Sequence, residues 1–272
     1  MTTRVRRLGA CAAAAGVLAA VVPSAVSAGP TVITMSGSTS VAPLATLLAK
    51  EYLKTHKGKV KFKLAQGGSD VGVADVAAGR VTIGNSSRDP KSSDPGGIFF
   101  NKIARDAICL VTNPKNPVAN LSQATIQSIF SGDIRDWSQV PGATATGTID
   151  LVGRTAASGT QDAFQKIFMG TKTVTSSIAA KASNGLVQQT VQTDPNAIGY
   201  VSLDFINGTS PAGYNGVACN LRNAKSGEYG GVRNFWMVTR GRATGVVSAF
   251  ISWVQNNAKA QAIVGKHWVP LK

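Results

Sequence analysis

Short stretches of strand character alternate with amphipathic helical stretches along the chain after residue 30, and this alternation restricts the fold more than any other feature. Val32–Met35 has the pattern of a strand, and apolar residues from Val41 to Tyr52 then recur at helical spacing on one face. The succession continues to a last helical pattern over residues 247–254. Strands separated by helices form mostly parallel sheets with helices on both faces. The sequence therefore predicts an α/β protein, and its 272 residues suffice for two lobes.

The first 28 residues have the features of a secretory signal peptide. Three arginines precede an apolar stretch from Leu8 to Val22, and Val26-Ser27-Ala28 offers the small residues that a signal peptidase needs. The stretch is short and interrupted by Pro23, which argues against a membrane anchor. Cys11 lies too early for a lipoprotein signal. We therefore expect cleavage near Ala28, no lipid anchor and no direct membrane insertion, so that the mature protein is secreted or periplasmic.

The mature chain is strongly basic. Removal of residues 1–28 leaves 25 Lys and Arg against 13 Asp and Glu, a net charge of about +12. A basic protein attracts anions, but the lysines are scattered and no aromatic-basic module appears, so nucleic acid is not an expected partner. A generally cationic solvated surface and attraction to anionic polymers of the cell envelope are both open interpretations.

Two cysteines, Cys109 and Cys219, remain after the signal peptide. An exported protein meets an oxidising compartment, which favours a disulfide between them, with two buried free thiols as the alternative. No further ligand set accompanies the two cysteines, so we expect neither a metal nor another cofactor.

Three turns rich in hydroxyl groups each follow a predicted strand and lead into a helix. They contain Ser38-Thr39-Ser40, Gly68-Ser69 and Ser158-Gly159-Thr160. Backbone N–H groups and the dipole at a helix start favour an anion, and Ser and Thr hydroxyls can donate to it. Helix capping alone explains any single turn of this kind. Three of them, together with basic residues, indicate an anion site at the carboxyl ends of the strands.

Two arginines lie beside these turns. Arg154 precedes Ser158 by four residues, and a guanidinium group has the fork geometry that phosphate accepts. Arg88 directly follows Ser87 and is a second candidate charge, although it could instead pair with Asp89 or Asp94. These residues predict an anion but do not identify it.

Taken together, the motifs resemble the phosphate-binding proteins of bacterial ABC uptake systems, over essentially all of the mature chain. The matching segments are Ser36–Leu44, Gly68-Ser69, Ser86–Arg88, Leu121–Trp137, Arg154 with Ser158–Phe164, and Ala197–Val201. The resemblance implies the two-lobed periplasmic-binding-protein fold of type II. Lobe one would comprise residues 29–111 and 236–272, lobe two residues 112–235, and the lobes would close on the ligand by a hinge motion.

The resemblance also implies the ligand-binding residues. They would be Ser38, Thr39, Ser40, Ser69, Ser87, Arg88, Arg154, Ser158, Gly159 and Thr160. Members of the family place an aspartate directly after the serine that corresponds to Ser87, where it accepts a proton from phosphate, but Arg88 stands there in this chain. Asp70 or Asp89 is the candidate replacement, and without an acceptor the selectivity for phosphate over sulfate is in doubt.

The function that the resemblance implies is capture of inorganic phosphate and its delivery to an ABC permease by a monomeric, non-enzymatic protein. One alternative is the same fold binding sulfate or molybdate. Another is a secreted basic protein that uses the fold for envelope or partner interactions. Hydrolysis is disfavoured because Ser158 lacks the Gly-x-Ser-x-Gly elbow. The two histidines, His56 and His267, stand at a helix end and near the C-terminus.

Overall fold

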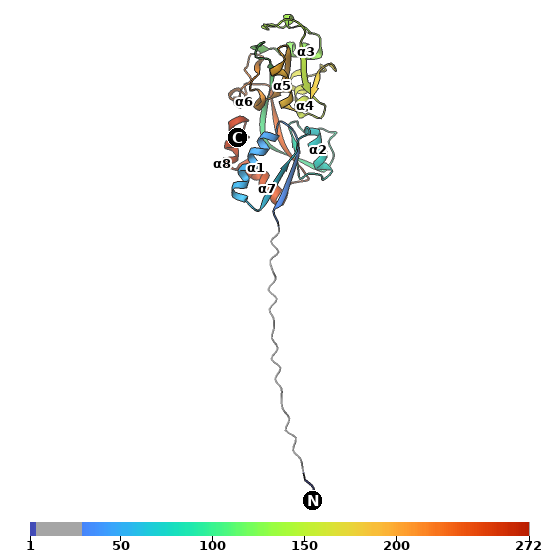
Figure 1. The fold of residues 1–272 in the computed structure, drawn as a ribbon, viewed down its shortest axis with the longest axis vertical. Coiled ribbons are helices and arrows are strands. Elements are labelled where there is room, and N and C mark those ends of the chain that lie inside the picture. The colour runs from blue at the N-terminus through green and yellow to red at the C-terminus, as the bar shows by residue number, and fades with distance from the viewer. Residues whose placement is uncertain (4–28, 272) are drawn as a thin grey trace.

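The computed structural model describes residues 1–3 and 29–271, so the predicted signal peptide lies outside the described residues. Strands and helices alternate in it, as the sequence predicts (Figure 1). The strands are β1 (Thr31–Gly37), β2 (Val60–Leu64), β3 (Ile83–Ser86), β4 (Ile98–Thr112), β5 (Asn120–Leu121), β6 (Asp150–Arg154), β7 (Ala179–Lys181), β8 (Ala197–Ser202), β9 (Ser210–Tyr214) and β10 (Val232–Arg240). The helices are α1 (Ala42–His56), α2 (Ser69–Ala77), α3 (Gln123–Ser131), α4 (Gly159–Phe164), α5 (Asn184–Thr193), α6 (Leu221–Ser226), α7 (Gly245–Asn256) and α8 (Ala258–His267). Short helical turns cover Trp137–Gln139, Gln165–Met169 and Leu203–Phe205.

The strands form one continuous mixed sheet with the order β2-β1-β3-β10-β4-β8-β6-β7. The three strands at each end, β2-β1-β3 and β8-β6-β7, are parallel. Strands β4 and β10 pair antiparallel with each other and with their other neighbours, because they carry the chain between the two ends. The prediction of an α/β fold is confirmed, and the parallel strands that we expected make up the two outer parts of the sheet.

Two large hydrophobic cores lie at opposite ends of this sheet. They define two lobes, which lie one above the other in Figure 1. The core of lobe one contains residues between 33 and 104 and between 235 and 268, and the core of lobe two contains residues 107–224, Tyr229 and Val269. The change from one core to the other therefore occurs within or next to β4 and β10. The boundaries at 111 and 236 that we expect from the sequence fall in the same two strands.

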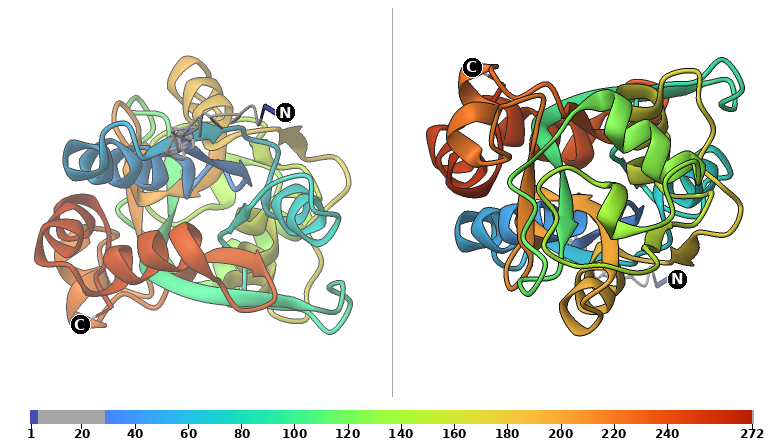
Figure 2. Two further views of the ribbon diagram at one scale, coloured as in Figure 1. Left: turned by 90° about the horizontal axis from the view of Figure 1, so that it is seen from below. Right: turned by 90° about the horizontal axis from the view of Figure 1, so that it is seen from above.

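Helices cover both faces of the sheet in lobe one. Residues of α1, α7 and α8 belong to the main core on one face, whereas Val73 and Val76 of α2 pack with Val238 in a separate small cluster. The view from the lobe-one end shows α1 and α2 on opposite sides (Figure 2). No helix in residues 1–3 and 29–271 combines the length and apolar character needed to cross a bilayer.

The predicted disulfide between Cys109 and Cys219 is present. It joins β4 to the segment that precedes α6, across a sequence separation of 110 residues. Both cysteines are buried in the core of lobe two. The bond therefore ties a strand that crosses between the lobes to the last helix of lobe two.

Candidate anion-binding site

The first hydroxyl-rich turn joins β1 to α1 and is held against β3. The backbone N–H of Ser38 donates to the carbonyl of Asn85 at 2.9 Å, and Ser38 Oγ accepts from the N–H groups of Ser40 and Val41. Ser38 Oγ in turn donates to Ser87 Oγ at 2.9 Å. The turn after β1 and the turn after β3 are thus brought together, although 49 residues separate the two serines.

The second turn places Ser69 against the same serine. Gly68 has a φ of 99°, a conformation that favours glycine, and Ser69 then begins α2. Ser69 Oγ accepts from the backbone N–H of Ser87 at 3.0 Å and lies 3.4 Å from Ser87 Oγ. Ser38, Ser69 and Ser87 therefore form one buried group of hydroxyls at the carboxyl ends of the lobe-one strands.

The third turn belongs to lobe two and meets the other two across the cleft. Ser158 caps α4, because its Oγ accepts from the N–H groups of Thr160 and Gln161. A Cβ atom on Gly159 would lie 2.3 Å from Ser69 Oγ and 2.8 Å from Ser87 Oγ. This approach is closer than any side chain allows, so the lobes are closed on each other and glycine is required at the contact.

Arg154 ends β6 and is buried in this closed cleft, with 3% of its surface exposed. Its Nη2 donates to Thr39 Oγ1 at 3.1 Å, and its Nη1 donates to Thr160 Oγ1 at 3.4 Å. The remaining contacts are with the carbonyls of Lys181 and Ala182. None of the ion pairs within residues 29–271 includes Arg154.

The electrostatic consequence is an uncompensated positive charge. Burial, and after it the charge of Arg233, lower the pKa of Arg154 to about 10, so the guanidinium stays charged at neutral pH. Burying a charge without a partner is costly. An anion bound next to Arg154 would remove that cost.

A second buried arginine, Arg233 of β10, points into the same place, and the sequence analysis did not find it. Its Nη1 donates to Thr160 Oγ1 and its Nη2 donates to Ser40 Oγ, each at 2.9 Å. The sequence signal was its position on the strand. Arg233, like Phe235 and Met237, occupies an inward-facing position of β10. An arginine in the apolar phase of a strand is unusual.

Arg233 differs from Arg154 because it has a carboxylate partner. Its Nη2 lies 2.9 Å from Asp106 Oδ2, and both side chains are almost fully buried. Asp106 faces Arg233 in the register of β4 with β10 and also accepts from Ser202 Oγ at 2.9 Å. Burial raises the pKa of Asp106, but the guanidinium of Arg233 acts in the opposite direction and favours the carboxylate.

Asn184, at the start of α5, is the other site residue that the sequence analysis missed. Its Nδ2 donates to Thr39 Oγ1 at 3.1 Å and to Ser40 Oγ at 2.8 Å. Its Oδ1 accepts from the backbone N–H of Ser202, which sets the orientation of the amide. No motif marks this asparagine, because its role depends on where α5 begins relative to lobe one.

We call Thr39, Ser40 and Thr160 the hydroxyl cluster. Two guanidinium groups and one amide direct N–H donors at its three oxygens. Ser40 Oγ and Thr160 Oγ1 also lie 3.1 Å apart, so each lobe contributes to the cluster. Two arginines and one aspartate leave an excess of one positive charge, and converging donors of this kind suit an oxyanion.

Arg88 lies beside the cleft, and its guanidinium is held by two carboxylates. Its Nε lies 2.5 Å from Asp70 Oδ1 and its Nη2 lies 2.6 Å from Asp94 Oδ1. The pairing with Asp94 is the alternative that the sequence left open. Two carboxylates thus already compensate the charge of Arg88, and its role as a charge for the anion stays a prediction.

The two candidate proton acceptors are differently placed. Asp89 Oδ1 accepts from Asn234 Nδ2 and Trp236 Nε1, so this carboxylate is engaged with β10 rather than with the hydroxyl cluster. Asp70 lies at the contact between the lobes, since its backbone N–H donates to the carbonyl of Ala157 at 3.1 Å. Its carboxylate is paired with Arg88, and a role as proton acceptor stays a prediction.

The hydroxyl cluster is almost closed off from solvent. A groove of about 540 Å³ reaches Thr39 and is lined by α1 of lobe one and by Ser183 and Gly185 of lobe two. The residues of the cluster are at most 5% exposed. The lobes would therefore have to move apart for an anion to reach the hydroxyl cluster.

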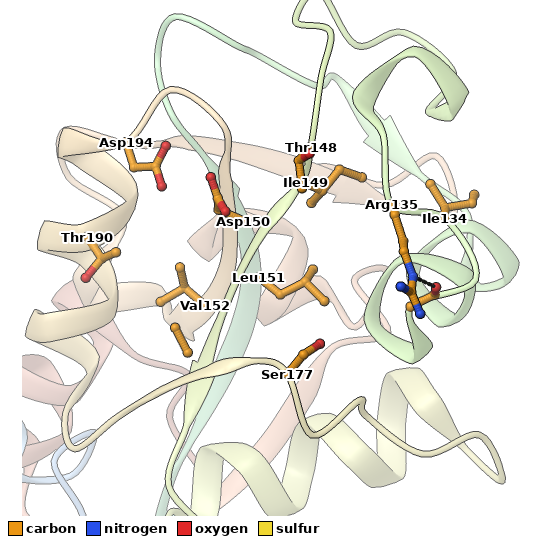
Figure 3. A pocket seen from close by; sticks show the side chains of 12 residues that line it. Ile134, Arg135, Thr148, Ile149, Asp150, Leu151, Val152, Ser177, Thr190 and Asp194 are labelled. Atoms are coloured by element: carbon orange, nitrogen blue, oxygen red, sulfur yellow. Dashed lines mark hydrogen bonds between the residues drawn. The ribbon is translucent and has the colours of Figure 1, made fainter.

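A separate hollow of about 430 Å³ lies in lobe two (Figure 3). Asp150 and Asp194 stand on one side of it and Arg135 on the other. Burial, and after it the neighbouring Asp194, raise the pKa of Asp150. Asp150 begins β6 whereas Arg154 ends it, so this hollow is not part of the cleft. No group of three or more metal-binding side chains occurs in the described part of the chain.

Comparison with known proteins agrees with this geometry. Residues 24–258 match the family model described as PBP superfamily domain. The chain belongs to the PBP superfamily. Among relatives in this superfamily, the phosphate-binding protein PstS of Bacillus subtilis is 26% identical over 237 residues, which cover 85% of this chain and 78% of that protein.

Solved structures give the same assignment of fold. A Clostridium perfringens protein assigned to phosphate ABC transport as a substrate-binding protein, with bound phosphate, is 32% identical. It superposes with a TM-score of 0.83 over 89% of this chain and 100% of that one. An ABC-type phosphate transport receptor from Vibrio cholerae is 25% identical, with a TM-score of 0.71 over 87% and 99% of the two chains. The two-lobed fold expected from the sequence is thereby confirmed.

Proposed function

We propose that this protein captures inorganic phosphate between its two lobes and delivers it to an ABC importer. The observation that carries the proposal is the buried guanidinium of Arg154, which has no carboxylate partner in residues 29–271 and points at hydroxyls from both lobes. Relatives from Bacillus subtilis and Clostridium perfringens, named for phosphate binding and phosphate transport, support the choice of anion.

The chemistry of the site suits a protonated tetrahedral anion. Arg154, Arg233 and Asn184 supply N–H donors from three directions, while serine and threonine hydroxyls can both donate and accept. The O–H group of monohydrogen phosphate needs at least one hydrogen-bond acceptor, and the three oxygens of the hydroxyl cluster can accept. The same donors would also serve sulfate or molybdate, so selectivity rests on the acceptors.

Binding without catalysis is the second part of the proposal. The hydroxyl of Ser158 caps α4, and the two histidines lie elsewhere in the described fold. His56 stacks on the ring of Tyr52 at 3.8 Å between ring centroids, and His267 pairs with Asp204. A nucleophilic serine needs a base within hydrogen-bond reach, and neither histidine is placed to serve Ser158. We further propose an exported monomer that works with an ABC permease.

Calorimetric titration of the ligand-stripped protein with phosphate, sulfate and molybdate at two pH values tests the proposal. We expect one phosphate per chain and rejection of sulfate. Arg154→Ala and Thr160→Val should each weaken phosphate binding at least tenfold, or about 1.4 kcal/mol. Arg135→Ala is the matched control, because Arg135 lies on the separate hollow of lobe two and its loss should leave the affinity unchanged.

The other outcomes distinguish the alternatives. Binding of sulfate or molybdate in preference to phosphate would keep the site but change the anion. If the phosphate affinity is unchanged in both Arg154→Ala and Thr160→Val, the hydroxyl cluster is not the phosphate-binding site. If no oxyanion binds, the function is that of a secreted basic protein with a different partner.

A further inference from the structure

The positive charge of the protein is concentrated on one lobe. Residues 29–111 and 236–272 carry 16 Lys and Arg against six Asp and Glu, whereas residues 112–235 carry nine against seven. The excess charge therefore belongs almost entirely to lobe one. A cationic surface that served only solubility would not need its excess of lysine and arginine to lie on one lobe.

Six lysines within fourteen residues account for much of the excess. They lie on the second half of α1, in the turn after it and on β2, and all six are exposed. We call this set the lysine patch: Lys50, Lys54, Lys57, Lys59, Lys61 and Lys63. Glu51 is the only acidic residue in this segment, and it pairs with Lys54 at 2.6 Å. A further lysine, Lys259 of α8, is close enough to contribute, after Lys54, to lowering the pKa of Glu51.

Three lysines of the lysine patch line an apolar hollow rather than a polar surface. Lys50, Lys54 and Lys57 rim a hollow of about 490 Å³ between α1 and β2, and Leu53 and Leu64 contribute to its floor. Leu64 is 37% exposed. An exposed leucine beside lysines matches a surface that is apolar below and anionic above.

The lysine patch lies at the end of lobe one that is remote from the cleft. Helix α1 starts two residues after Ser40 and runs away from it for 15 residues, a length of about 22 Å. Strand β1 begins beside the patch, because the N–H of Thr31 donates to the carbonyl of Lys59 at 3.0 Å (Figure 1). A partner bound at the patch would therefore leave the cleft free to open and close.

Ordinary structural roles explain only part of this arrangement. β2 is an edge strand, and lysines on an edge strand prevent pairing with other chains, which accounts for Lys61 and Lys63. Lys54 lies in the last turn of α1, where a cation interacts favourably with the helix dipole. Neither role requires Lys50, or an exposed leucine beside the charges.

We propose that the lysine patch docks lobe one onto an anionic phospholipid surface, with the leucines at the level of the headgroups and no segment inserted across the bilayer. The proposal does not depend on which anion the cleft binds. Each lysine held near an anionic bilayer contributes roughly fivefold to the binding constant, and the contribution decreases with ionic strength. Docking would keep an exported receptor beside the membrane in which an importer lies.

Vesicle co-sedimentation tests the proposal with the chain from residue 29 onward, which contains both hydrophobic cores. The vesicles are pure phosphatidylcholine or the same lipid with about a third of phosphatidylglycerol. We expect binding to the anionic vesicles only, with loss of binding at high salt. The triple variant Lys50→Gln, Lys54→Gln, Lys57→Gln should bind about 100-fold more weakly, and Leu64→Gln should weaken binding several-fold.

The matched control is Lys115→Gln, Lys166→Gln, Lys172→Gln, which removes the same charge from exposed positions of lobe two. This variant should retain vesicle binding, and both triple variants should retain the phosphate affinity of the wild type. Equal losses in the two triple variants would overturn the proposal, because net charge alone would then explain the binding. Binding to soluble polyphosphate without binding to vesicles would also overturn it in favour of an anionic polymer.

Discussion

Arg154 and Arg233 donate to the same atom, Thr160 Oγ1, at 3.4 and 2.9 Å. One residue ends a strand of lobe two and the other lies on a strand that runs between the lobes. Asp106 compensates Arg233 alone. The cleft thus holds two guanidinium groups around one neutral oxygen. The excess positive charge that results is one that a bound oxyanion would compensate.

Closure of the lobes depends on the absence of a side chain at residue 159. In Gly159→Ala the new Cβ would lie 2.3 Å from Ser69 Oγ, so the lobes could not approach as closely. We expect phosphate affinity to decrease at least tenfold while the unfolding temperature changes little, because alanine is well tolerated near a helix start. Titration calorimetry measures the affinity, and small-angle scattering with phosphate measures closure.

Gly185→Ala is the control for this change, since Gly185 also lies near the start of a lobe-two helix. A Cβ atom at residue 185 would have only Ser183 Oγ within 4 Å, at 3.9 Å, which is an ordinary contact. This variant should bind phosphate as the wild type does. A Gly159→Ala protein that closes and binds normally would mean that the lobes do not need the contact at Gly159.

The ion pair between Asp106 and Arg233 should make stability depend on phosphate. Asp106→Asn leaves Arg233 buried without a carboxylate partner, which should reduce the free energy of unfolding by about 3–5 kcal/mol. Saturating phosphate should then raise the unfolding temperature more in the variant than in the wild type, because the anion compensates both arginines. Differential scanning fluorimetry with and without phosphate measures this difference.

Asp150→Asn serves as the comparison for Asp106→Asn. Asp150 is exposed and has the like-charged Asp194 as a neighbour, so its neutralisation should not destabilise the protein. An equal phosphate-induced shift in the wild type and in Asp106→Asn would show that Asp106 is not electrically coupled to the ligand.

The pairing of Arg88 with Asp94 predicts a pH dependence of stability. Burial alone would raise the pKa of Asp94, but hydrogen bonds from Arg88 and from the N–H of Lys91 outweigh it and hold that pKa below its ordinary value. The resulting stabilisation is present above the unfolded-state pKa of about 4 and is lost as the pH falls through the folded-state value. Asp94→Asn should therefore cost about 1.5–3 kcal/mol at pH 7.

Urea unfolding at pH 7, 5 and 3.5 measures this contribution. The difference between the wild type and Asp94→Asn should shrink as the pH decreases from 5 to 3.5. Asp133→Asn, at a fully exposed position on lobe two, should show a much smaller difference. A difference for Asp94→Asn that is constant with pH would mean that its carboxylate charge contributes nothing.

The disulfide should contribute strongly to the stability of lobe two. Because it closes a loop of 110 residues, its loss in Cys109→Ala, Cys219→Ala should lower the free energy of unfolding by about 4–5 kcal/mol. Denaturant titration with and without a reductant measures this value. The reductant should shift the midpoint of the wild type but not that of the double variant, and an unchanged wild-type midpoint would contradict the prediction.

Much of the fold could be predicted because its signals are local. The helical period from Val41 to Tyr52 and the strand pattern at Val32–Met35 depend only on near neighbours, and both elements are present at those positions. Strand β7 and helix α8, which follows the last helical pattern of the sequence, were found only in the structure. Strands β4 and β10 are set by their pairing with each other, which joins residues far apart in the sequence.

The residues of the candidate site also differ in whether local sequence could predict their contacts. Arg154 and Thr160 lie six residues apart in one motif and are in contact in the structure. Ser38 of the first turn likewise contacts Ser87. Arg88 had Asp89 and Asp94 as sequence neighbours, and only the packing of α2 adds Asp70 as its second partner. Arg233 and Asn184 belong to no motif at all.

Interactions within a few residues are enough to specify the α/β succession, the three hydroxyl-rich turns and the arginine beside the third, so all of these could be read along the chain. Which charges are compensated and which are not depends instead on long-range packing. Ser40 and Arg233 are hydrogen-bonded although 193 residues separate them. Such contacts arise only when two lobes and two crossing strands bring distant residues together, and a buried charge acquires its function from the partners that packing provides or withholds.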